Sequence, residues 1–92
     1  MEIGTRYQNV QVSEFTVKRE GKQYSVNFEF TSTQGNFKVN LGGIRDIENL
    51  CDLLNAERLW LKEESGSQTE YGRYTLGIQE ETYSEVVFDV LS

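Results

Sequence analysis

The chain has 92 residues, one cysteine, no histidine, no proline and a formal net charge of −6. This length suits a single domain, which we expect to cover residues 1–92, and no stretch is long and apolar enough for a membrane helix. Without histidine the chain lacks the commonest general base and the commonest metal ligand, so we expect neither a cofactor nor a metal.

The N-terminal half has the alternation of apolar and polar residues that is typical of half-buried strands. The predicted strands cover residues 10–17, 23–31 and 37–41. Segments 19–22 (REGK) and 32–36 (STQGN) have turn composition, so the three strands should form an antiparallel meander. The parity of the apolar positions changes at Ser13-Glu14, which predicts a β-bulge there.

Residues 44–56 carry apolar side chains at the spacing of an amphipathic helix of about three turns. Cys51 lies within the apolar arc of this helix, so we interpret it as a core residue. The preceding pair Gly42-Gly43 resembles a phosphate loop only superficially, because it matches neither glycine-rich fingerprint. Asp46 and Glu48 would also repel a phosphate at the helix start. We therefore interpret the glycines as a turn that lets the helix begin.

Strand patterns return in the C-terminal half, at residues 59–62, 74–78 and 83–91, with a turn at 80–82. Residues 65–72 have loop composition. The strand over 83–91 is apolar on part of both faces, which favours a central position or contact with a partner. The predicted fold is α+β. Its antiparallel β-sheet has five to six strands in the order β-β-β-α-β-β-β, and one amphipathic helix packs on one face.

Several activities lack support in the sequence. A nucleophilic role for Cys51 would need a base that the chain does not offer, and the carboxylate pairs lie beside turn signals with no concave site predicted near them. Lys18, Arg19 and Lys22 cluster at a hairpin tip, but the overall negative charge opposes phosphate binding. We therefore expect neither an enzyme nor a direct nucleic-acid binder.

The negative charge is concentrated in the second half. Residues 1–45 hold six basic and four acidic side chains, whereas residues 46–92 hold three basic and eleven acidic ones. Aromatic residues that commonly anchor protein interfaces lie among these acids. The candidate partner-binding residues are Trp60, Glu63, Glu64, Glu70, Tyr71, Glu80, Glu81, Tyr83 and Glu85. Alternation does not reveal whether Trp60 or its neighbours Leu59 and Leu61 face the core.

The sequence favours a small cytoplasmic protein-binding module, because one cysteine cannot form an intramolecular disulfide and the N-terminus lacks a signal-peptide pattern. It would inhibit a protein partner with a basic surface, such as a nucleic-acid-binding enzyme, by steric and electrostatic occlusion. Small phage-encoded inhibitors, anti-CRISPR proteins among them, and bacterial immunity proteins share this short, acidic profile as a class. The alternatives are a structural protein that forms a homo-oligomer through edge strands, and a small-ligand-binding domain with its site between sheet and helix.

Overall fold

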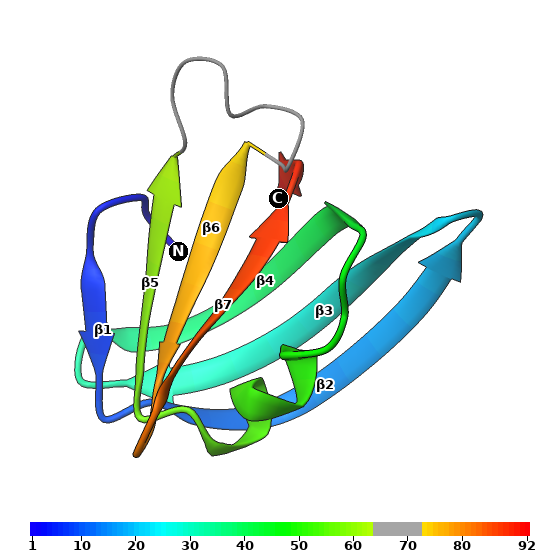
Figure 1. The fold of residues 1–92 in the computed structure, drawn as a ribbon. Coiled ribbons are helices and arrows are strands. Elements are labelled where there is room, and N and C mark those ends of the chain that lie inside the picture. The colour runs from blue at the N-terminus through cyan, green and yellow to red at the C-terminus, as the bar shows by residue number, and fades with distance from the viewer. Residues whose placement is uncertain (64–72) are drawn as a thin grey trace.

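The computed structural model describes residues 1–63 and 73–92, and these residues form eight strands in two antiparallel sheets of four (Figure 1). Sheet A has the order β1-β5-β6-β7, and sheet B has the order β2-β3-β4-β8. The strands are β1 (Arg6–Gln8), β2 (Gln11–Glu20), β3 (Gln23–Ser32), β4 (Gly35–Ile44), β5 (Arg58–Glu63), β6 (Tyr74–Gln79), β7 (Tyr83–Phe88) and β8 (Val90–Leu91).

The predicted α+β class is wrong, because the described residues contain no α-helix and form two four-stranded sheets instead of one sheet of five to six strands. The predicted helix over 44–56 is replaced by a 3₁₀ helix, η1 (Leu50–Asn55). Leu50 and Leu53 are buried, and their spacing of three matches the 3₁₀ period. Cys51 is exposed, so its interpretation as a core residue is also wrong.

The glycine pair explains why the helix does not begin where the sequence predicted it. Gly42 and Gly43 lie within β4, which continues to Ile44 opposite Tyr24 of β3. Gly42 pairs with Val90, and a Cβ atom on Gly43 would lie 2.8 Å from Cβ of Asp89. The glycines therefore neither start a helix nor form a phosphate loop. They let β4 pass close to the chain that enters β8.

The antiparallel meander predicted for the first half is confirmed as β2-β3-β4. Its bulge is also confirmed, since the β2–β3 register shifts between Val12 and Glu14. This shift turns both Val12 and Phe15 toward the hydrophobic core, against which both are packed. The strands β5, β6 and β7 likewise follow the predicted alternation, with the turn at 80–82 between the last two.

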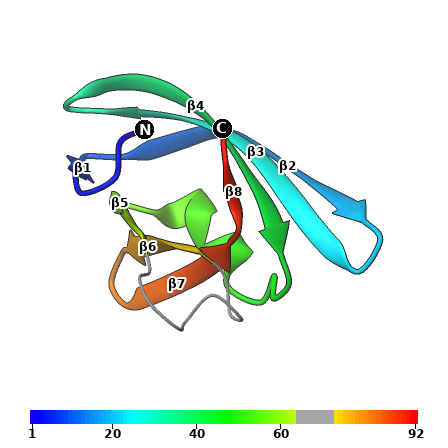
Figure 2. The same ribbon diagram turned by 90° about the horizontal axis from the view of Figure 1, so that it is seen from above.

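The core lies between the sheets, with β5, β6, β7 and η1 on one side of β2, β3 and β4 (Figure 2). Tyr7 of β1 meets Phe30 edge-to-face at 5.6 Å and Phe37 at 4.9 Å between ring centroids. Phe30 stacks in turn on Phe28. These rings join the edge strand of sheet A to the centre of sheet B, and such contacts stabilise a core beyond the area they bury.

The chain changes sheets three times: through η1 between β4 and β5, and at two corners, β1–β2 and β7–β8. At the β7–β8 corner, Val86 and Phe88 are buried in sheet A. The single residue Asp89 separates β7 from β8, and Leu91 of β8 pairs with Leu41 in sheet B. The two-sided apolar pattern over 83–91 thus arises because the chain changes sheets. Among the described residues, no helix has the length and hydropathy to cross a bilayer.

Candidate functional site

The outer face of sheet A carries an aromatic side chain laid over a glycine. Leu59 and Leu61 are fully buried, so alternation along β5 turns Trp60 outward and settles the face that the sequence left open. Trp60 pairs with Gly77 of β6. A Cβ atom on Gly77 would lie 2.2 Å from Cε2 of Trp60, so the indole occupies the space that a side chain would need.

Two more side chains complete this surface, which we call the aromatic platform: Arg6, Trp60, Gly77 and Tyr83. Tyr83 stacks on Trp60 with a centroid separation of 5.4 Å and an interplanar angle of 12°. The guanidinium carbon of Arg6 lies 4.7 Å from the centroid of the Trp60 ring, within the range of a cation–π contact. The stack fixes the indole while Tyr83 keeps 45% of its surface exposed.

Charges of opposite sign flank the aromatic platform. Strand pairing places Arg6 opposite Trp60, and alternation places Arg58 and Lys62 on the same outer face. On the other side, Glu85 of β7 pairs with Gly77. The face is therefore basic along β1 and β5 and acidic along β7.

The structure brings some predicted binding residues together and separates others. Trp60, Tyr83 and Glu85 share the outer face of sheet A, and Glu80 and Glu81 lie in the turn that precedes Tyr83. Glu63 lies at the far end of β5, where it pairs with Tyr74 rather than with the 80–82 end of the sheet. The predictions for Glu64, Glu70 and Tyr71 lie outside the described residues.

Sequence reasoning missed Arg6 and Gly77. Arg6 is distant from Trp60 along the chain, so only the β1–β5 pairing reveals their contact. Gly77 gave a weak signal, since a glycine at an internal position of a predicted strand commonly marks a close approach by another group.

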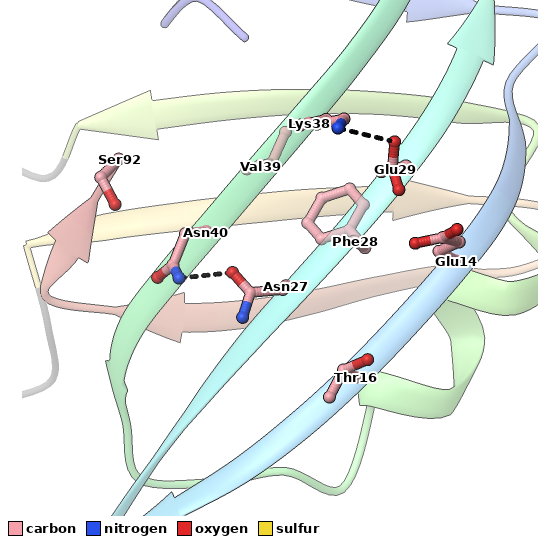
Figure 3. A pocket seen from close by; sticks show the side chains of 9 residues that line it. All are labelled: Glu14, Thr16, Asn27, Phe28, Glu29, Lys38, Val39, Asn40 and Ser92. Carbon is pink, nitrogen blue, oxygen red and sulfur yellow. Dashed lines mark hydrogen bonds and ion pairs between the residues drawn. The ribbon is translucent and has the colours of Figure 1, made fainter.

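The outer face of sheet B forms a shallow hollow of about 330 Å³ (Figure 3). Its floor is a row of short polar groups across the strands, in which Asn40 donates a side-chain hydrogen bond to Asn27. Lys38 forms an ion pair with Glu29, with Nζ 3.7 Å from Oε1. The hollow lies on sheet B and not between a sheet and a helix, where the sequence placed a possible ligand site.

Glu14 of β2 borders this hollow beside Glu29. A hydrogen bond with Glu29 and the negative charge of that side chain raise the pKa of Glu14, while Lys38 opposes the effect. The two carboxyl groups repel each other when both are ionised. Lys38 supplies a nearby positive charge, but its ion pair is with Glu29.

The sequence matches no protein-family model, and comparison with curated proteins and with solved structures finds no significant match.

Proposed function

We propose that this protein is a protein-binding module whose contact surface is the aromatic platform. The observation that carries the proposal is the Trp60–Tyr83 stack on the outer face of sheet A, held flat over Gly77. Trp, Tyr and Arg are the side chains most often responsible for binding energy at protein interfaces. Trp60 loses little further conformational freedom on binding, because Arg6 and Tyr83 already hold it.

The acidic residues define the kind of partner. Glu80, Glu81 and Glu85 lie on the Tyr83 side of the platform, across it from the basic side chains along β1 and β5, and the whole chain carries −6. Such a field accelerates the approach of a partner with a basic surface, with an effect that salt weakens. The protein would act by covering that basic surface, which suits an inhibitor of a nucleic-acid-handling enzyme. We propose no enzymatic activity, and the single cysteine fits a reducing cytoplasm.

Affinity capture tests the role of the aromatic platform. Immobilised wild-type protein and a Trp60→Ala/Tyr83→Ala variant are compared as baits in one extract from the source organism or its host. The control bait is Leu54→Ser/Val90→Ser, which changes two apolar residues that are 54% and 56% exposed away from the platform. We expect one captured protein to be lost at least tenfold from the platform variant and retained by the control. Equal capture by all three baits would contradict the proposal.

A second comparison tests the charges. Glu80→Lys/Glu81→Lys changes the net charge from −6 to −2, and Glu2→Lys/Glu20→Lys makes the same change in the N-terminal segment and at the tip of the β2–β3 hairpin. If the acids near Tyr83 guide the partner, the first variant slows association more than the second, and the difference shrinks at high salt. Equal association rates for the two variants would remove this electrostatic mechanism.

A further inference from the structure

The strand β2 is a long exposed edge. It ends sheet B and pairs with β3 on one side only; η1 lies close to β2, but no described strand pairs with its other side. Figures 1 and 2 both show the β2–β3 hairpin projecting beyond sheet A. Residues 16–20 are all exposed, including Val17 at 39%. An unpaired edge of this length offers backbone donors and acceptors to another strand.

The turn of the hairpin determines which backbone groups are free. Glu20 and Gln23 flank a two-residue turn, and such a flanking pair exchanges backbone hydrogen bonds. Hydrogen-bonded and non-hydrogen-bonded positions alternate along an antiparallel pair. Accordingly, Glu14, Thr16 and Lys18 direct their backbone groups toward β3. The backbone groups of Phe15 and Val17 point to the free edge.

Only some registers let a second β2 strand pair antiparallel with this edge. Residues with free backbone groups must face each other, so the twofold axis passes through a residue position of β2. An axis at Thr16 places Phe15 opposite Val17 and Glu14 opposite Lys18. An axis at Val17 would instead place Glu14 opposite Glu20, and an axis at Lys18 would place two lysines face to face. Cross-strand pairs of opposite charge stabilise a sheet, and like charges destabilise it.

We propose that two copies of this chain form a homodimer by antiparallel pairing of their β2 edges, centred on Thr16. Glu14 of each β2 strand then lies opposite Lys18 of the partner subunit, so the isologous interface contains two such pairs. Sheet B becomes continuous across the two copies, and Val17 is covered by Phe15 of the partner subunit.

The surroundings of Glu14 support this register. Glu14 lies beside Glu29, and a hydrogen bond with Glu29 together with the negative charge of that side chain raises the pKa of Glu14. Lys18 of the partner subunit would bring a positive charge to this carboxylate. The pairing uses sheet B, so it leaves the aromatic platform on sheet A open and stands independently of the proposed function.

The edge also has features that oppose pairing. The bulge at Ser13 and the charges of Lys18 and Arg19 are of the kind that proteins use to block edge association. Protection of this sort predicts a monomer at every concentration. The Thr16-centred register instead predicts association that requires opposite charges at positions 14 and 18.

Charge exchange distinguishes these cases. Sedimentation equilibrium is measured from micromolar to millimolar concentration for the wild type, Glu14→Lys, Lys18→Glu and the double variant. Each single variant places like charges opposite each other at two positions, so we expect its dissociation constant to rise at least tenfold. The double variant restores opposite charges, and so does an equimolar mixture of the two single variants. Both should therefore regain association. Circular dichroism verifies that each variant is folded.

A cross-linking experiment tests the centre of the pairing. The residue on the twofold axis occupies a non-hydrogen-bonded pair, in which the Cα atoms lie about 4.5 Å apart, and this spacing permits a disulfide. In a Cys51→Ser background, Thr16→Cys should form covalent dimers under mild oxidation much faster than Thr31→Cys, an exposed control on β3. A wild type that stays monomeric throughout, or equal cross-linking of the two variants, would overturn the proposal.

Discussion

The outer faces of the two sheets are built in opposite ways. On sheet A, the indole of Trp60 covers the bare backbone of Gly77 and stacks on Tyr83. On sheet B, short polar side chains such as Asn27 and Asn40 bond to each other across the strands and leave a shallow hollow. Short polar side chains, as on sheet B, are sufficient to keep an exposed antiparallel face solvated. The aromatic platform is therefore the feature that calls for a functional explanation.

The largest expected effect comes from filling the space beneath Trp60. Gly77→Ala places a Cβ atom 2.2 Å from Cε2 of the indole, so the indole must move. Overpacking of this kind costs about 1–3 kcal/mol of unfolding free energy. Urea denaturation measures that cost, and a change in tryptophan fluorescence reports the displacement.

Gly42→Ala is the matched control for this substitution. Its Cβ would lie 3.4 Å from Cβ of Val90, which is an ordinary contact. It should change the unfolding free energy by less than about 1 kcal/mol in either direction, since alanine at a compatible position is neutral or slightly stabilising, and leave the fluorescence unchanged. If both alanine variants gave the same spectrum and stability, the close approach of Trp60 to Gly77 would not hold.

Removal of the indole should have the next largest effect. Trp60→Ala eliminates the stack on Tyr83 and the contact with Arg6, at an expected cost of about 1–2 kcal/mol. Thermal unfolding followed by circular dichroism measures it. Lys62→Ala changes an exposed residue of the same strand and face, and should remain within about 0.5 kcal/mol of wild type.

On sheet B, we expect a smaller loss from the polar row. Asn27→Ala removes the acceptor for the Asn40 amide and should cost about 0.5–1.5 kcal/mol in urea denaturation. Asn40 keeps its two backbone bonds to Ser92, so the C-terminal strand should stay in place. A loss larger than that of Trp60→Ala would reverse the ranking of the two faces.

The smallest effect concerns Glu14 and depends on pH. Folding raises the pKa of Glu14 above its ordinary value of 4.5, so the folded state holds this proton more tightly than the unfolded chain. The stability linked to protonation is fully present below that value and is lost as the pH rises through the higher folded pKa.

Glu14→Gln removes the repulsion from Glu29 and should therefore raise the Tm slightly at pH 7. The gain should disappear in acid, where Glu14 of the wild type is also uncharged. Calorimetry at low protein concentration, which avoids any effect of dimer formation, measures both values. A gain of the same size at both pH values would show that charge repulsion is not the cause.

Much of the local structure could be read from the sequence. The alternation at Tyr24–Phe30 and Leu76–Ile78 predicted strands that the structure contains, and the parity change at Ser13-Glu14 predicted its bulge. These features depend on neighbouring residues and on the period of a strand, so they are encoded locally.

The helix prediction failed for a physical reason. Residues 44–56 carry a helical apolar pattern, but Ile44 is held in β4 by pairing with β3, and β8 lies against the preceding glycines. Distant strand pairing therefore outweighed local periodicity, leaving only the 3₁₀ turn around Leu50 and Leu53.

The sequence by itself determined the strands of the meander, their turns and the excess of acidic residues in the second half. Only the tertiary structure decided that the chain changes sheets at Asp89, that Trp60 faces outward over Gly77, and that Arg6 lies against it. Those contacts join residues far apart in the chain, and local patterns carry no information about which strands become neighbours.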